Sequence, residues 1–302
     1  MKLIITGGSG LLAINWAVAL RDRFSVTLTV HDRDVSLAGV RAQEIELESV
    51  DDIVSSLEVA QPQMVIHTAG LANVDRCEAD PALARHINVD LAANVAQACA
   101  KLGLPLVHIS TDHLFSGESE SVDETTSVAP INVYGWTKAE AETRVLEAHP
   151  LALVIRTNFY GWGTSYRHSF SDQVIDALRA GKELILFQDV FYTPILVETL
   201  AQAVHDLIEH KVSGIFHVVG DERTSKYCFG LKIAEEFSLD VRLIKPGFIT
   251  DQVSLAPRPH DMSLSNEKTC KLLGRDLGGV SEHILRLHQQ EQSGLAREIQ
   301  KQ

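Results

Sequence analysis

Short apolar segments alternate with longer amphipathic segments over the first half of this sequence. The apolar segments are predicted strands at Lys2–Thr6, Val26–Val30, Gln43–Leu47, Met64–Thr68, Leu106–Ser110 and Leu151–Arg156. The predicted helices between them are Leu11–Arg21, Val50–Val59, Pro81–Leu102 and Asn132–Ala148. Several strands are apolar at successive positions, which is typical of a parallel sheet that helices cover on both faces. The pattern predicts an α/β fold with a doubly wound parallel sheet.

The regular alternation ends after Arg156, and the second half predicts a smaller domain. Helices are expected near residues 172–180, 196–209 and 225–237, and strands near residues 184–187, 191–193, 214–219 and 241–245. A Pro-rich loop is expected at 246–259, and the Gln-rich end after His288 is expected to be a solvated or fraying helix. We expect one domain of residues 1–157 plus about 196–220, and a second, discontinuous domain of about 158–195 and 221–302.

Composition excludes several classes of function. The 302 residues carry 27 basic and 40 acidic side chains, and a net charge of −13 argues against nucleic-acid or acidic-membrane binding. No run of about 18 apolar residues occurs, and a strand-like segment follows the first methionine directly, so we expect a cytoplasmic protein without a membrane span. The cysteines lack ligand spacing and are expected to be reduced thiols, and the 13 histidines form no metal motif. We therefore expect no metal site.

Glycines follow the first predicted strand directly, in the sequence Thr6-Gly7-Gly8-Ser9-Gly10-Leu11-Leu12-Ala13. This segment fits the pattern Gly-x-Gly-x-x-Ala and lies where the strand ends and a helix begins. A tight turn without side chains lets a pyrophosphate approach the backbone, and the helix N-terminus then binds the anion. The segment predicts a Rossmann-type dinucleotide site with the cofactor-binding residues Gly7, Gly8, Ser9, Gly10, Leu11 and Leu12.

The end of the second predicted strand bears on which cofactor binds. An acidic side chain there would bind the ribose 2′-hydroxyl of NAD, whereas a basic one would pair with the 2′-phosphate of NADP. Counting without gaps places His31, rather than Asp32, at the end of the strand, with Arg33 close by. The sequence favours NADP(H) and leaves NAD(H) open.

Tyr134 and Lys138 are four residues apart on a predicted helix, so they share one face of it. A phenol has a reference pKa of about 10, and a lysine ammonium one turn away favours its ionised form. The same ammonium can bind the ribose hydroxyls of a nicotinamide cofactor. Thr111 ends another predicted strand, where ligands bind in open α/β sheets, and its hydroxyl can bind the substrate oxygen that Tyr134 protonates. These residues are the predicted catalytic group.

The motifs together resemble a known superfamily. Similarity to the extended short-chain dehydrogenase/reductase superfamily is carried by Thr6–Ala13, Ser110–Asp112, Tyr134 with Lys138, and Arg258–Asp261. Within it the chain most resembles the dTDP-4-dehydrorhamnose reductase family, with further matches at Ala69–Glu78, Asn132–Gly135 and Asp189–Pro194. The resemblance implies NAD(P)H-dependent reduction of the 4-keto group of a nucleotide-linked deoxysugar. It also implies that the family's catalytic Thr, Tyr and Lys correspond to Thr111, Tyr134 and Lys138.

The resemblance implies further site residues. On the cofactor side these are Glu46 and Leu47 near the adenine, and Thr68, Ala69 and Gly70 along the ribose and pyrophosphate. On the substrate side they are Thr111, Asp112, His113, Asn158 and Arg258. Of these, Asn158 is expected to point at the substrate phosphates, and Arg258 is expected to grip the diphosphate with its forked guanidinium.

The sequence departs from the family at two places and leaves other functions open. His113 replaces a family Tyr, and the segment Phe159–Trp162 also differs, so neither the nucleotide base nor the sugar follows from the motifs. His113 also stands where sugar-nucleotide dehydratases carry a Glu, which argues against that chemistry. One alternative is a nucleotide-sugar epimerase of the same superfamily. Another is a non-catalytic, NADP-binding regulatory subunit resembling the methionine adenosyltransferase β subunit. A homodimer also stays open.

Overall fold

A parallel sheet forms the centre of the computed structural model, which describes residues 1–31, 33–251 and 256–302. Within this part of the chain the sheet has seven strands in the order β11-β6-β5-β4-β1-β2-β3. Their bounds are β1 Lys2–Thr6, β2 Ser25–Val30, β3 Val40–Glu44, β4 Met64–His67, β5 Leu106–Ile109, β6 Leu153–Arg156 and β11 Gly214–His217. The order reverses beside β1, and open α/β sheets bind ligands at such a point.

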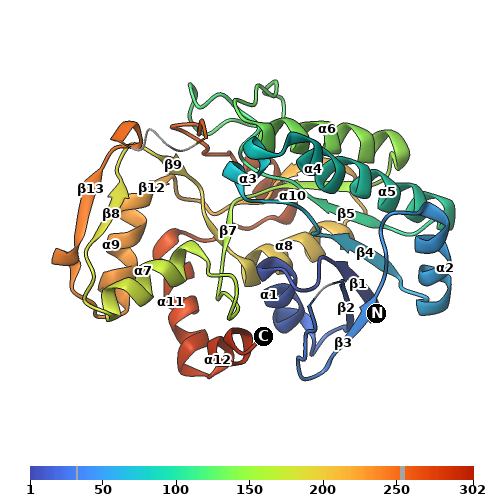
Figure 1. Ribbon diagram of the computed structural model, residues 1–302, viewed down its shortest axis with the longest axis horizontal. Helices are drawn as coiled ribbons and strands as arrows, with labels where there is room; N and C mark the ends of the chain where they lie inside the picture. Colours follow the sequence, from blue (N-terminus) through green and yellow to red (C-terminus); the bar gives the residue numbers. More distant parts are fainter. Residues whose placement is uncertain (32, 252–255) are drawn as a thin grey trace.

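Helices cover both faces of this sheet (Figure 1). One face is covered by α1 Leu11–Leu20 and α8 Val197–Glu209, and α10 Glu267–Leu273 packs against α8 and β11. The other face is covered by α2 Val50–Ala60, α5 Leu91–Leu102 and α6 Val133–Ala148. Alternate strand residues serve the two faces, since Leu3 and Ile5 belong to the core under α1 and α8 whereas Ile4 belongs to the core under α2 and α5.

The remaining elements lie mainly to one side of the sheet, at the left of Figure 1. Short strand pairs join β10 with β7 and β13 with β8 in parallel, and β12 with β9 antiparallel. The strands are β7 Phe159–Tyr160, β8 Leu184–Phe187, β9 Phe191–Tyr192, β10 Ile195–Leu196, β12 Thr224–Ser225 and β13 Ile244–Gly247. The helices are α7 Phe170–Arg179, α9 Lys226–Glu236, α11 Val280–Gln292 and α12 Leu295–Gln300.

Some elements differ from the sequence prediction. Strand β3 ends at Glu44, and the apolar residues at 45 and 47 that suggested a strand come after it. It is an edge strand with mostly exposed residues, so it lacks the apolar pattern of the central strands. Residues 241–243 form a 3₁₀-helix capped by Asp240, so β13 begins later than expected. The predicted helix 81–102 consists of α4 Pro81–Arg85, a π-helix at His86–Asp90 and α5. The short helix α3 Val74–Ala79 was not predicted, because six residues are too few to show periodicity.

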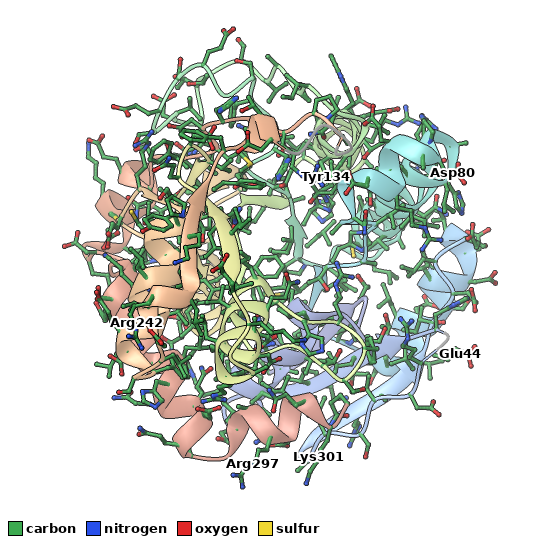
Figure 2. The ribbon with its side chains drawn as sticks, turned by 60° about the vertical axis from the view of Figure 1, so that its left-hand side comes forward. Glu44, Asp80, Tyr134, Arg242, Arg297 and Lys301 are labelled. Carbon is green, nitrogen blue, oxygen red and sulfur yellow. The ribbon has the colours of Figure 1, made fainter. Side chains whose placement is uncertain are left out.

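The expectation of a solvated or fraying C-terminal end is wrong. Helix α12 packs through Ala296 and Ile299, each of which is only 1% exposed. Glu298 forms an ion pair with Arg21 at the end of α1. The polar side chains of Arg297 and Lys301 lie on the outer side of this end (Figure 2). The glutamines suggested a solvated tail, but the buried positions fall on a single helical face.

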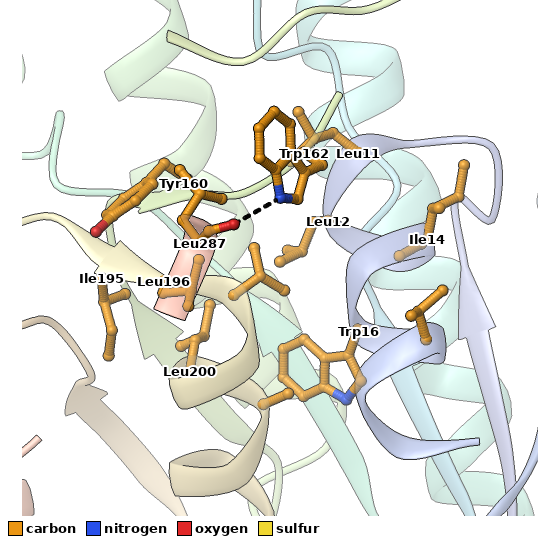
Figure 3. Packing of buried hydrophobic residues seen from close by; sticks show 14 of the residues in the cluster. Leu11, Leu12, Ile14, Trp16, Tyr160, Trp162, Ile195, Leu196, Leu200 and Leu287 are labelled. Carbon is orange, nitrogen blue, oxygen red and sulfur yellow. Dashed lines mark hydrogen bonds between the residues drawn. The ribbon is translucent and has the colours of Figure 1, made fainter. Parts of the chain in front are cut away.

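The hydrophobic cluster under α1 and α8 joins the sheet to the C-terminal elements. Figure 3 shows Trp162, from the segment after β7, between α1 and α11. The indole nitrogen of Trp162 donates a hydrogen bond of 3.2 Å to the carbonyl oxygen of Leu287 in α11. Trp16 in α1 and Leu200 in α8 belong to the same buried cluster. The segment from β7 to α7 is therefore held firmly beside the helix that follows the glycine turn.

A buried ion pair fixes α6 to the sheet. Arg156, at the end of β6, donates hydrogen bonds of 2.9 and 2.7 Å to the two carboxylate oxygens of Glu142. The two side chains are 4% and 5% exposed. Since Glu142 follows Lys138 by one helical turn, this pair sets how the catalytic face predicted for α6 meets the sheet.

The order and direction of the strands confirm the predicted α/β fold with a doubly wound, Rossmann-type parallel sheet. The chain also returns to this sheet at Gly214–His217, since β11 pairs with β6. Which of the two predicted domains binds which ligand stays a prediction.

We expect the Arg156–Glu142 pair to be far more sensitive to single than to double substitution. Arg156→Met leaves the Glu142 carboxylate buried without its partner and should lower the free energy of unfolding by about 3–5 kcal/mol. Arg156→Met combined with Glu142→Leu should recover most of that loss, because no buried charge remains. Urea unfolding measures both effects. As a control, Lys101→Met breaks an exposed pair with Asp51 and should cost less than about 1 kcal/mol.

Candidate active site

The glycine turn after β1 is closed by two neighbouring backbones. Gly7 has a φ of +71°, and a Cβ built on it would lie 2.7 Å from the Cα of Ala69, beyond β4. A Cβ on Gly8 would lie 2.6 Å from the carbonyl oxygen of Thr29 in β2. The Gly10 amide donates to the Gly7 carbonyl at 2.8 Å, and α1 begins at the next residue. The turn therefore brings backbone close to the N-terminus of α1, where an anion can approach.

A cavity of about 400 Å³ opens at this turn. Of the residues predicted to bind a cofactor, eleven line it: Gly7, Ser9, Gly10, Leu11, Leu12, Arg33, Thr68, Ala69, Gly70, Tyr134 and Lys138. The structure therefore brings together the glycine turn, the loop after β4 and the start of α6, which are far apart in the sequence. Gly8, His31, Glu46 and Leu47 do not line this cavity.

Of the two basic residues after β2, Arg33 lies at the cavity and His31 does not. Arg33 lines the cavity, and its guanidinium carbon lies 4.5 Å from the ring centroid of Tyr166. His31 is exposed and lies 3.6 Å from the carboxylate of Glu46. Asp32, which the sequence weighed against His31, lies outside the described residues. Arg33 is therefore the basic residue of this strand end that the structure places at the cavity.

Helix α6 presents Tyr134 and Lys138 to the cavity. Asn132 caps the helix, since its side chain accepts a 2.8 Å hydrogen bond from the Gly135 amide. Figure 2 shows Tyr134 between α3 and α4 on one side and the C-terminal elements on the other. Both side chains line the same cavity as the glycine turn, as their spacing of one helical turn requires. Trp136, in contrast, is 61% exposed.

Burial moves the pKa values of these two residues in opposite directions. It raises the pKa of Tyr134 to about 12, and a hydrogen bond with the Thr111 side chain partly opposes this shift. Burial lowers the pKa of Lys138 to about 8, and the negative charge of Glu142 partly opposes this shift. The Lys138 ammonium donates a hydrogen bond of 2.8 Å to the Ile109 carbonyl. The pKa of Tyr134 is raised in this structure, whereas the sequence predicted that Lys138 favours the ionised form.

Two buried histidines lie behind Lys138. Lys138 Nζ is 3.4 Å from Nε2 of His108, and the rings of His108 and His67 stack with centroids 5.4 Å apart. Burial lowers the pKa of His67 to about 3, and burial together with Lys138 lowers that of His108 well below its usual value. Both rings are therefore neutral at physiological pH, so the ammonium of Lys138 is the charge on this side of the cavity.

The predicted substrate residues after β5 and β6 lie close together. Thr111 donates to one carboxylate oxygen of Asp112 at 3.2 Å, and Asn158 donates to the other at 2.5 Å. The His113 ring meets Tyr134 edge-on, with centroids 5.5 Å apart. The carboxyl ends of two adjacent strands thus bring Thr111, Asp112 and Asn158 beside Tyr134.

Arg258 acts on His113 through its charge, but its own donors are engaged elsewhere. Its guanidinium donates to the carboxylate of Asp75 in α3 at 2.8 Å and to the carbonyl of Ala256 at 2.9 Å. Arg258 does not line the cavity at the glycine turn. In this structure its forked guanidinium therefore joins α3 to the loop before Pro259.

The sequence missed the segment that covers the glycine turn. The hydroxyl of Tyr166 donates a hydrogen bond to the carbonyl oxygen of Ser9, and Arg33 stacks on the same ring. Arg167, His168 and Phe170 of this segment also line the cavity. The aromatic and Gly-rich sequence after Arg156 was a visible signal, but nothing in it indicates which distant turn it will meet.

Two other classes of site find no support in the part of the chain that the structure describes. It contains no group of three or more His, Cys, Asp or Glu residues that could hold a metal ion. None of its helices has the length and apolar character needed to cross a bilayer.

Known proteins resemble the chain over most of its length. The RmlD substrate binding domain family model matches residues 1–292. The probable low-salt glycan biosynthesis reductase Agl14 of Haloferax volcanii is 30% identical over 263 residues, which span 86% of this chain and 88% of that protein. Methionine adenosyltransferase 2 subunit beta of Xenopus laevis is 28% identical and spans 90% of this chain and 82% of its own.

Solved structures resemble the fold equally well. A dTDP-4-dehydrorhamnose reductase from Clostridium acetobutylicum superposes with a TM-score of 0.84 at 28% identity, covering 97% of this chain and 100% of its own. The same enzyme from Bacillus anthracis, in complex with NADP, gives a TM-score of 0.82 at 25% identity, covering 96% and 99%. The chain therefore belongs to the RmlD substrate binding domain family, within the extended short-chain dehydrogenase/reductase superfamily.

Proposed function

We propose that this protein is an NAD(P)H-dependent reductase that converts the 4-keto group of a nucleotide-linked deoxysugar into a hydroxyl group. One observation carries the proposal: Tyr134 and Lys138, one turn apart on α6, line the same cavity as the glycine turn. A hydride donor held by that turn and a proton donor on α6 would then face one shared space.

The glycine turn fits a dinucleotide. Gly7 and Gly10 line the cavity without side chains, and a Cβ on Gly7 would collide with the backbone of Ala69. The turn therefore offers backbone to the cavity, which suits a pyrophosphate. The backbone of residues 7–10 and the N-terminus of α1 would hold the pyrophosphate, and Lys138 would reach the ribose next to the nicotinamide. The bound cofactor supplies the hydride. Arg33 at the cavity supports NADP(H), because a guanidinium pairs well with a 2′-phosphate.

Tyr134 has the protonation state that a reduction needs. With its pKa raised to about 12, the phenol keeps its proton at neutral pH and can give it to the alkoxide that forms when the carbonyl is reduced. Thr111 has a single O–H donor, which would turn from Asp112 to the carbonyl oxygen and orient it for this transfer. The Lys138 ammonium stabilises negative charge on this side of the cavity while it is protonated.

The substrate class is supported by the relatives. The printed names of two solved structures describe dTDP-4-dehydrorhamnose reductases, and that of the Haloferax volcanii relative describes a glycan biosynthesis reductase. The Asp112–Asn158 contact beside Thr111 supplies acceptors and donors for sugar hydroxyls.

A regulatory subunit is the second candidate, because the methionine adenosyltransferase subunit beta is similar along 90% of this chain. An affinity purification that yields a stable enzyme partner, together with no turnover of any keto-sugar, would favour it over the reductase. An epimerase would retain its cofactor and consume no NADPH.

A substrate screen tests the proposed reaction directly. We expect at least one of the dTDP-, UDP- and GDP-linked 4-keto-6-deoxysugars to oxidise added NADPH, followed as the loss of absorbance of the reduced nicotinamide. Parallel assays with NADH should show a lower kcat/KM, because Arg33 can pair only with the 2′-phosphate of NADPH. If neither cofactor is oxidised with any of these sugars, the reductase proposal is wrong.

Tyr134→Phe should lower kcat by about 10²–10⁴-fold, because it removes the proton donor and keeps the ring that packs against His113. NADPH affinity, measured by fluorescence titration, should stay close to that of the wild-type protein. Trp136→Phe is a matched control on the same helix, since Trp136 points to solvent and should leave kcat unchanged. Turnover by Tyr134→Phe at the wild-type rate would remove Tyr134 from the mechanism.

The pH dependence of kcat should follow Lys138. Its ammonium is present below its pKa of about 8 and is lost as the pH rises through that value, so kcat at saturating substrate should fall above about pH 8. Lys138→Met should show a low kcat without this fall, because it carries no titrating ammonium. A wild-type kcat that stays constant from about pH 7 to about pH 9.5 would contradict this role of Lys138.

A further inference from the structure

Lys226, at the start of α9, lies between the cofactor cavity and the residues after β5. Its ammonium nitrogen is 3.5 Å from the ring centroid of Tyr192 and 4.7 Å from that of Phe170. Phe170 lines the cavity at the glycine turn. The charge of Asp112 acts on Lys226, and the charge of Lys226 acts on His113. Lys226 therefore faces the predicted substrate side of the site, although no sequence motif indicated it.

The ammonium of Lys226 has no hydrogen-bond acceptor among the residues that the structure describes. Lysine carries three N–H donors, and an aromatic face attracts the charge without replacing an acceptor. Asp112 is not the acceptor for the Lys226 ammonium. Its carboxylate oxygens accept hydrogen bonds from Thr111 and Asn158, and it forms no ion pair with Lys226. Lys226 is half-buried and its ammonium lies against two aromatic faces, so its N–H donors can take oxygen atoms of a ligand in place of water.

Other buried polar atoms on this side of the site also lack a hydrogen-bond partner among the described residues. The hydroxyl oxygens of Tyr192 and Tyr160 and the Nδ1 atom of His113 are buried, and within the described ranges none of them has a hydrogen-bond partner. Tyr192 and Tyr160 are 2% and 3% exposed. Tyr192 lies close enough to Tyr160 and Asp112 for both to act on its ionisation and raise its pKa, after burial as the main cause. These atoms and Lys226 therefore border one polar region beside Asp112.

Two neighbouring arginines are occupied by acidic partners. Arg258, whose charge also reaches His113, is bound to Asp75 at 2.8 Å. Arg223, three residues before Lys226, donates to the carboxylate of Asp261 at 2.5 Å. The Lys226 ammonium thus differs from both, because its donors are free to take an anionic oxygen from a ligand.

We propose that Lys226 binds an anionic oxygen of the substrate, which in a nucleotide-linked sugar is an oxygen of the diphosphate. This inference rests on the proposed function and adds a specificity-determining residue to it. In a hexose the diphosphate at C1 lies across the ring from the keto group at C4. Lys226 begins α9 and Tyr134 lies near the start of α6, and these two helices lie apart in Figure 1. The sugar would thus lie between Tyr134 and Lys226.

Binding of nucleoside diphosphates tests this assignment without any turnover. Calorimetric titration of the NADP⁺-loaded protein should give a dissociation constant for dTDP, UDP or GDP that rises about 10- to 150-fold in Lys226→Gln, as for a lost hydrogen bond to a charged group. Binding of the matching nucleoside, which has no phosphate, should be unchanged. Lys226→Arg should restore most of the affinity, because it restores a cation with N–H donors.

The matched control is Lys232→Gln, on the same helix α9. Lys232 is paired with Glu222 at 2.5 Å, so its loss should leave nucleoside diphosphate binding unchanged. With a keto-sugar substrate, Lys226→Gln should raise KM by the same factor as the dissociation constant and leave kcat within about twofold. An unchanged NADPH affinity and thermal midpoint would show that the variant is folded.

The outcomes separate the two proposals. Equal nucleoside diphosphate affinities for the wild-type protein and Lys226→Gln, an equal loss of nucleoside binding, or no binding by the wild-type protein would each overturn the role of Lys226. A wild-type protein that binds a nucleoside diphosphate through Lys226 but reduces no keto-sugar would leave this role standing and remove the reductase function.

Discussion

The buried ion pair between Arg156 and Glu142 fixes the helix on which the proposed chemistry depends. Arg156 ends a central strand, and Glu142 follows Lys138 by one turn, so two hydrogen bonds hold the proposed catalytic face of α6 against the sheet. The same carboxylate opposes the fall in the pKa of Lys138 that burial causes. One interaction thus sets the position of the ammonium and contributes to keeping its charge.

Burial has different consequences for the charged and neutral groups of this site. Tyr134 keeps its proton, and His67 and His108 stay neutral, because desolvation disfavours their charged forms. We propose Lys138 and Lys226 as cations at the two ends of the substrate position. A protein with a net charge of −13 can accept an anionic ligand here because the positive charges are local.

Much of the fold and part of the site could be predicted from the sequence. Apolar strands buried on both faces, a glycine turn after β1 and the one-turn spacing of Tyr134 and Lys138 depend on local periodicity, which residues encode directly. The edge strand β3 was misplaced because its exposed residues carry no such periodicity. The packed C-terminal helix was also mistaken for a solvated end, because its partner Arg21 is far away in the sequence.

The sequence by itself determined the sheet, the position of the glycine turn and the shared face of Tyr134 and Lys138, since each follows from neighbours along the chain. Only the tertiary structure decided that Tyr166 meets Ser9, that Arg258 pairs with Asp75, and that Lys226 lies among aromatic rings with no acceptor from the described residues. The first two contacts join residues more than a hundred positions apart, and the surroundings of Lys226 depend on which side chains the fold brings to it. No local sequence pattern specifies either.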